Sequence, residues 1–151
     1  MSIVIFTVDE PMYLPRYLRP VLEAHSGSIE TIIDAPTKDG GLVQIIPERY
    51  RMFGPVTFCR YGVRFATAKV LGWTPSRFDY ALSERYHSLL NLASDYDIPV
   101  RTVRDINDPA FVREMKDLDP SMLLSISCRQ KFGEGLLSID HCDCINLHGS
   151  L

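Results

Sequence analysis

SIVIFTVDEPMYLPRYLRPVLEAHSGSIETII, residues 2–33, is the stretch that decides the fold. It opens with the apolar run Ser2–Val8, which is typical of a buried β-strand. Apolar residues then recur at helical spacing from Tyr13 to Ala24, and a second strand-like run covers Ile29–Ile33. A strand, a helix and a strand in this order predict two parallel strands joined by a right-handed crossover.

The start of the first helix carries its own signals. Asp9 stands where a helix cap is expected, and Pro11 suits a first turn. Pro15 and Pro20 fall within the helical pattern, so we expect an irregular helix.

The same alternation continues toward the carboxyl end. Ser83 is a candidate cap for a helix that includes Tyr86–Ala93. Further elements are expected at Ile98–Val103 (strand), Asn107–Leu118 (helix), Ser121–Ser127 (strand), Gly133–Ile139 (short helix) and Cys142–His148 (strand). The order predicts one α/β domain over residues 1–151: a Rossmann-like open, mostly parallel sheet with helices on both faces. Ligands of such folds bind at the carboxyl ends of strands where strand order reverses, so we look after Ile126 and at the end of the last strand, which we expect to be central.

Residues 34–41 have a loop composition, and the stretch 42–78 is less regular. Gly54, Gly62 and Gly72 argue against one long uninterrupted helix. Residues that recur at helical spacing could line one face: Val56, Cys59, Val63, Ala66 and Val70. Between residues 49 and 78 there are six basic and no acidic residues. This stretch is interpreted either as a basic patch that meets an anionic substrate or a membrane surface, or, with preference, as a core helix with solvated arginines.

Composition limits the classes of protein. With 46% apolar and 23% charged residues, the chain is ordinary for a globular domain, and its formal charge of −3 does not imply a large nucleic-acid surface. No apolar run is long enough to span a bilayer, and Met1–Phe6 lacks the features of a signal peptide, so the expected compartment is the cytoplasm.

Four cysteines would stay reduced in that compartment: Cys59, Cys128, Cys142 and Cys144. His141, Cys142, Cys144 and His148 cluster in sequence, but the paired-cysteine spacing of zinc knuckles does not occur. We therefore expect no metal, and core packing for Cys142 and Cys144 in the last strand.

The last expected strand combines an amide with an imidazole. Side chains alternate along a strand, so Asn146 and His148 point to the same face. An amide can donate to a developing oxyanion, and an imidazole can move a proton near neutral pH. This pair suits acyl or formyl transfer to an amine, although two such residues at a strand end are more often structural.

The segment Cys144–Leu151 resembles the C-x-N-x-H-x-S-L segment of formyltransferases that use 10-formyltetrahydrofolate. The resemblance implies that Asn146 and His148 are the catalytic asparagine and histidine. Leu123–Gly133 is similar to the family's strand and loop that hold the pterin ring. It implies folate contacts, mainly through the backbone, at Ser127, Cys128, Arg129, Gln130 and Lys131.

The specific part of this resemblance covers residues 121–151. The family's third catalytic residue, an aspartate, lies beyond the Asn-x-His strand, and this chain stops at Leu151, so we expect a domain truncated at its carboxyl end and inactive by itself. The resemblance implies formyl transfer from 10-formyltetrahydrofolate to an amine of an amino sugar or of methionyl-tRNA. A purine precursor is a further acceptor in the family. The alternatives are a folate-binding module without catalysis and a formyltetrahydrofolate hydrolase.

Overall fold

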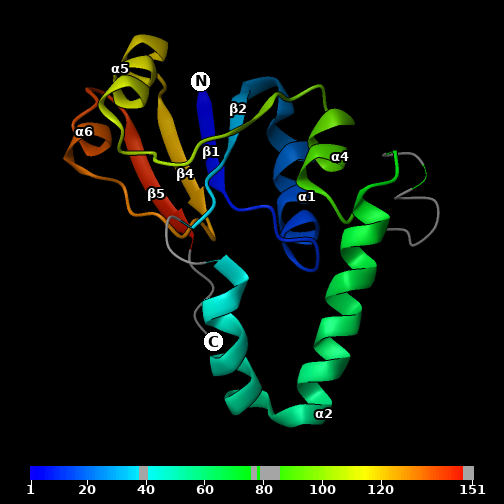
Figure 1. The fold of residues 1–151 in the computed structure, drawn as a ribbon. Helices are drawn as coiled ribbons and strands as arrows, with labels where there is room; N and C mark the ends of the chain where they lie inside the picture. Colours follow the sequence, from blue (N-terminus) through cyan, green and yellow to red (C-terminus); the bar gives the residue numbers. More distant parts are fainter. Residues whose placement is uncertain (38–40, 76–77, 79–85, 148–151) are drawn as a thin grey trace.

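A computed structural model describes residues 1–37, 41–75, 78 and 86–147; of the side chains in 41–49 it describes only that of Pro47. The sheet has five strands in the order β3-β2-β1-β4-β5, and every pair is parallel. The strands are β1 (Ile3–Thr7), β2 (Ile29–Asp34), β3 (Val100–Thr102), β4 (Met122–Ile126) and β5 (Asp143–Leu147). This open parallel sheet confirms the predicted α/β class (Figure 1).

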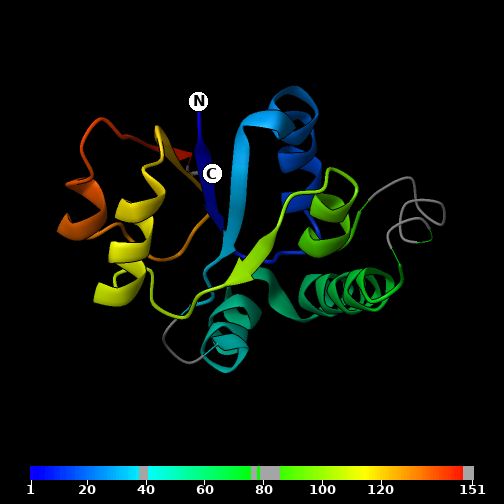
Figure 2. The same ribbon diagram turned by 90° about the horizontal axis from the view of Figure 1, so that it is seen from above.

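Helices cover both faces of the sheet, as predicted. The helical segments of the described chain are α1 (Leu14–His25), η1 (Ser26–Ser28), α2 (Gly41–Gly72), α4 (Leu89–Ser94), α5 (Pro109–Leu118) and α6 (Glu134–Leu137). Figure 2, which looks along the sheet from above, places α1 and α4 on one face and α5 and α6 on the other. Two apolar clusters fill these layers. One contains Ile5 and Leu18, and the other contains Phe6 and Met115, because side chains of β1 alternate between the faces.

The first helix begins later than the sequence predicts, and Asp9 does not cap it. Its cap position, Tyr13, makes no side-chain cap hydrogen bond. Instead, the Glu10 carboxylate accepts hydrogen bonds from the backbone N–H groups of Met12, Tyr13 and Leu14 at 3.0, 2.7 and 3.3 Å. Pro15 lies in the first turn, where a missing N–H costs nothing.

The stretch predicted to be irregular forms a helical hairpin, α2, that projects beyond the carboxyl ends of the strands (Figure 1). The two arms meet at Gly54, whose φ of 72° and ψ of 167° are accessible almost only to glycine. The preferred interpretation of a core helix is wrong. The residues expected to be buried, Val56, Cys59, Val63, Ala66 and Val70, are all exposed.

Several boundaries also differ from the prediction. Ser83 lies outside the described residues, and α4 is capped by Ser88, whose hydroxyl accepts from the Asn91 N–H. Asp108 caps α5 through the N–H groups of Ala110 and Phe111, close to the predicted start. The last strand, β5, is not central: it is the edge of the described sheet, and all five of its residues are exposed.

Candidate functional site at the carboxyl edge of the sheet

Strand order reverses between β1 and β4. From β1 the chain moves outward to β2 and β3, then returns across α5 to place β4 on the other side of β1. Crossovers that leave in opposite directions open a crevice beyond the carboxyl ends of the two strands, where doubly wound folds bind ligands. The loop at 127–133 follows β4, and the end of β5 lies beside it. Both sequence-predicted segments are therefore adjacent to this point of the sheet.

Gln130 acts as a bridge between three loops. Its Nε2 donates to the carbonyl oxygens of Pro36 at 2.8 Å and Arg104 at 2.9 Å, and its Oε1 accepts from the Ile106 N–H at 3.2 Å. The bonds join the loop after β4 to those after β2 and β3. Because both the Nε2 and the Oε1 of the Gln130 amide are hydrogen-bonded, this side chain positions the loop after β4.

Asn107 fixes the same loop from the other end. Its Nδ2 donates to the Lys131 carbonyl oxygen at 3.0 Å, and its Oδ1 accepts from the Gly133 N–H at 2.7 Å. A Cβ on Gly133 would lie 2.8 Å from that Oδ1, so glycine permits this close approach. Sequence reasoning gave Asn107 only a place at a helix start; its part in the loop depends on tertiary structure.

Ser127 turns the chain at the end of β4. Its φ of 54° lies in the left-handed region, which is uncommon for residues other than glycine. Its N–H donates to the Leu147 carbonyl oxygen at 3.2 Å, so this backbone donor already pairs with the end of β5. Its side chain is exposed at the carboxyl edge.

The other three loop residues differ in exposure. Cys128 is half-buried, and burial raises the pKa of its thiol. Arg129 and Lys131 are exposed, and Arg129 Nη1 lies 3.5 Å from the Thr37 hydroxyl in the loop after β2. The loop thus presents two exposed cations beside Ser127, on a backbone held by Gln130 and Asn107.

Asn146 pairs in register with Ser125 of β4, on the face covered by α5 and α6. Its side chain is exposed and has no hydrogen-bond partner among the described residues. His148, the other predicted catalytic residue, lies outside the described residues. The Asn146 amide is thus exposed at the penultimate residue of β5.

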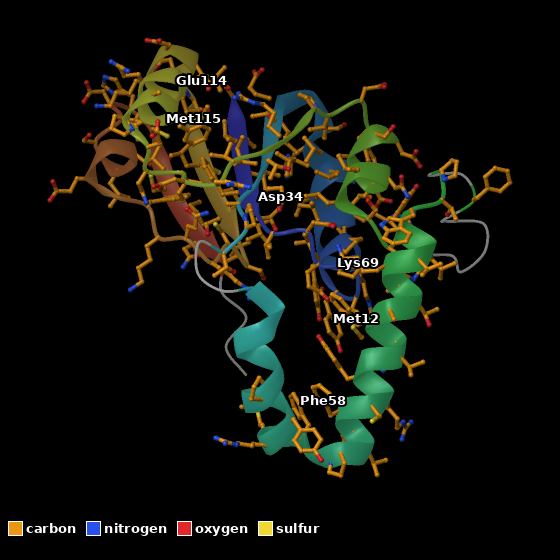
Figure 3. All side chains as sticks on the ribbon, viewed as in Figure 1. Met12, Asp34, Phe58, Lys69, Glu114 and Met115 are labelled. Atoms are coloured by element: carbon orange, nitrogen blue, oxygen red, sulfur yellow. The ribbon has the colours of Figure 1, made fainter. Side chains whose placement is uncertain are left out.

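A polar cluster at the ends of β1 and β2 was missed by the sequence analysis. Asp34 Oδ1 accepts from the Asp9 N–H at 3.0 Å, and Asp34 Oδ2 accepts from the Thr102 hydroxyl at 3.3 Å. Asp9 Oδ2 lies 2.7 Å from Lys69 Nζ on α2 (Figure 3 labels Lys69 and Asp34). Beside them, the fully buried Thr7 hydroxyl has no partner within the described part of the chain. No spacing in the sequence marked this cluster, because its members come from distant segments.

The cysteine–histidine cluster gains no support as a metal site from the described residues. Across 1–37, 41–75, 78 and 86–147, no group of three or more His, Cys, Asp or Glu side chains could hold a metal ion. Burial raises the pKa of the Cys142 and Cys144 thiols.

Two hollows lie away from the carboxyl edge. One, of about 280 Å³, follows α1 between Arg16, Glu23 and Tyr86. The other, of about 340 Å³, lies between α4 and the start of β3, near Leu90 and Pro99. Neither is lined by Asn146 or by the loop residues 127–131. The carboxyl edge is therefore defined by topology and exposed polar groups, not by either hollow.

No model of a known protein family matches this chain. None of the helices that the structure describes is both long and apolar enough to cross a bilayer.

Proposed function

We propose that this chain binds 10-formyltetrahydrofolate at the carboxyl edge of its sheet and contributes to formyl transfer to an acceptor amine. The observation that carries the proposal is the position of the loop at 127–131 and of Asn146: they flank the end of β4, at the reversal of strand order where this fold class binds ligands. The sequence resemblance supplies the identity of the ligand.

The roles follow from the chemistry of transfer. The acceptor nitrogen attacks the formyl carbon, and the carbonyl oxygen gains negative charge in the tetrahedral intermediate. An amide N–H of Asn146 would stabilise that oxyanion, and His148 would move a proton from the attacking nitrogen toward the departing nitrogen of tetrahydrofolate. The unpaired, exposed amide of Asn146 supports this assignment, since it is not engaged in a structural hydrogen bond with any described residue.

The loop would bind the pterin chiefly through its backbone. Gln130 and Asn107 already fix its course, so little ordering would be needed on binding. The exposed cations Arg129 and Lys131 would attract the anionic tail of the folate.

Folate titration and an activity assay test the proposal. A stable folate analogue should shift the backbone amide resonances of 127–131 more than those of α5. In the longest natural form of the chain, Asn146→Ala and His148→Ala should each lower tetrahydrofolate release roughly a hundredfold or more. Suitable acceptors are nucleotide amino sugars, methionyl-tRNA and a purine precursor.

Four results would count against parts of this assignment. Resonances of 127–131 that stay in place at saturation would remove the binding site. Unchanged turnover in both variants would remove the catalytic roles. Folate binding without turnover of any amine would favour a non-catalytic module, whereas formate release without an acceptor would favour a hydrolase.

A further inference from the structure

The second arm of α2 carries an apolar stripe that faces away from the rest of the molecule. Its members recur every three or four residues and so share one helical face: Val56, Cys59, Val63, Ala66 and Val70. The three valines are 72, 67 and 57% exposed. At a rise of 1.5 Å per residue the stripe is roughly 21 Å long. Isolated exposed apolar residues are common, but a continuous row of this length indicates a docking surface.

The opposite face of the arm accounts for its internal packing. Phe58 lies between the two arms near their junction (Figure 3), and its ring centroid is 5.5 Å from that of Tyr50 on the first arm. Ala68 is buried near the base of the hairpin. The two arms thus meet near the tip through their inner faces, and this contact does not involve the apolar stripe.

Apolar exposure continues at both ends of the stripe. Met52 and Phe53, next to the break at Gly54, are 69 and 42% exposed. Trp73, directly after the arm, is 83% exposed. Large apolar and aromatic groups therefore border the stripe at the tip and at the base.

Positive charge flanks the stripe. Arg60 and Arg64 are exposed on the same arm, and Arg51 is exposed near the tip. Residues 49–78 hold six of the chain's 16 lysines and arginines and none of its 19 aspartates and glutamates. Helix α2 itself has five basic residues and one acidic residue, Glu48, and the rest of the chain has 11 basic and 18 acidic residues, so a cationic hairpin projects from an acidic body.

We propose that the α2 hairpin docks on the surface of an anionic phospholipid membrane, with the valine stripe in the interfacial region and Arg60 and Arg64 on lipid phosphates. An apolar face bordered by arginine and tryptophan is the composition that favours the plane of the interface. The acidic body would be repelled from the same surface, which fixes the orientation. The carboxyl edge of the sheet, from which the hairpin projects, then lies on the membrane side of the molecule.

Other partners fit these observations less well. A second copy paired through the same stripe would bring two cationic arms together, and the second arm, residues 55–72, has no acidic residue to offset Arg60 and Arg64. Nucleic acid would use the arginines but would leave the valine stripe exposed, because phosphate contacts dominate such binding. An anionic lipid surface uses both features.

Trp73 provides a direct readout, since it is the only tryptophan in the sequence. With vesicles of phosphatidylglycerol and phosphatidylcholine its emission should shift to shorter wavelength, and the protein should sediment with the vesicles. Pure phosphatidylcholine should give neither effect, and salt should weaken binding. Arg60→Gln with Arg64→Gln should weaken binding by roughly fivefold per charge removed. Val63→Asp should abolish the shift.

Matched variants on the body separate this effect from net charge and from folding. Arg113→Gln with Lys116→Gln removes the same charge from the exposed side of α5, and Leu137→Asp alters an exposed apolar residue of α6. Both control variants should bind vesicles as the parent protein does. The thermal unfolding midpoints of all variants should equal that of the parent, which shows that they are folded. Absence of the Trp73 shift with anionic vesicles would overturn the proposal. The proposal would also be overturned if the protein bound RNA but not vesicles and Val63→Asp left the RNA binding intact. A protein that dimerised through α2 and did not bind vesicles would overturn it as well.

Discussion

Lys69 Nζ lies 2.7 Å from Asp9 Oδ2, which ties the second arm of α2 to the end of β1. The other oxygen of the same carboxylate accepts the N–H of Leu89, the first residue of α4, at 3.2 Å. One side chain thus joins the central strand, the hairpin and the helix that follows it. Asn91 of α4 completes the attachment by donating to the carbonyl oxygens of Gly72 and Thr74.

We expect Asp9 to matter more for stability than Lys69. Asp9→Ala removes two partners and leaves the Leu89 N–H unpaired, so the free energy of unfolding should fall by about 2 kcal/mol. Lys69→Met should cost less than about 1 kcal/mol, because both side chains are about one-third exposed and the ion pair is screened. Urea unfolding measures both. Lys116→Met, at an exposed position of α5, is the control, and equal losses at Asp9 and Lys69 would show that the Leu89 contact contributes nothing.

Gln130 should be a structural residue of the candidate site, and Arg129 should not. Gln130→Ala leaves the Pro36 and Arg104 carbonyls and the Ile106 N–H without their partner, so unfolding free energy should fall by about 2–3 kcal/mol. Arg129→Ala, one residue away and exposed, should change it by less than about 0.5 kcal/mol. If Arg129→Ala were the more destabilising, the bridge would not hold the loop as described.

Much of this fold follows from the sequence because it depends on local patterns. Apolar runs such as Ile3–Thr7 and the helical spacing of α1 set the strand–helix order, and that order alone predicts a parallel sheet. The position of β5 at the edge was not predictable in this way. An apolar strand has the same pattern at the centre and at an edge, and only the strand order distinguishes them.

The wrong predictions for α2 and Asp9 also arose because a local pattern does not show which distant residues it will contact. The spacing of Val56, Val63 and Val70 identifies a helical face but not what covers it, so the same pattern fits a core helix and a docking helix. Asp9 has the residue type and position of a helix cap, yet its carboxylate is used by Lys69, sixty residues away. At the candidate site, resemblance indicated the loop after β4, whereas the bridging role of Gln130 depends on three loops distant in sequence.

The Cys128 thiol should titrate above the ordinary value for a cysteine. Burial raises its pKa, and the negative charge of Asp34 acts in the same direction. Because the thiolate is the nucleophile, alkylation at a given pH should be slower than for a free thiol, and its rate should rise only at higher pH. A variant with Cys59, Cys142 and Cys144 replaced by serine isolates this thiol. A titration midpoint at or below that of free cysteine would contradict the burial seen here.

Two threonines of the sheet should respond oppositely to the same substitution. The Thr7 hydroxyl is buried without a partner in the described chain, so Thr7→Val should leave stability unchanged or raise it by up to about 1 kcal/mol. The buried Thr31 hydroxyl donates to the Pro99 carbonyl oxygen at 3.1 Å, and Thr31→Val should lower stability by about 1–2 kcal/mol. Thermal and urea unfolding of both variants measure the contrast. A clear loss at Thr7 would mean that its hydroxyl has a partner in the folded chain.

Gly54 and Gly62 form a matched pair on α2, because a Cβ at either position would meet nothing within 4 Å. They differ only in backbone conformation. At Gly54 the φ of 72° with ψ of 167° is almost exclusive to glycine, so Gly54→Ala should cost about 1–3 kcal/mol through strain alone. Gly62 continues the second arm as ordinary helix, and Gly62→Ala should stabilise it by about 0.5–1 kcal/mol by restricting the unfolded chain.

The same pair tests whether the turn at Gly54 determines the shape of the hairpin. If it does, Gly54→Ala should relieve its strain by opening the arms, and fluorescence transfer between probes at Arg51 and Thr67 should decrease. Gly62→Ala should leave that transfer unchanged and raise the unfolding midpoint. Equal, small effects of both substitutions would mean that alanine is accommodated at the break, and the contact between Tyr50 and Phe58 would then have to close the hairpin without help from the glycine.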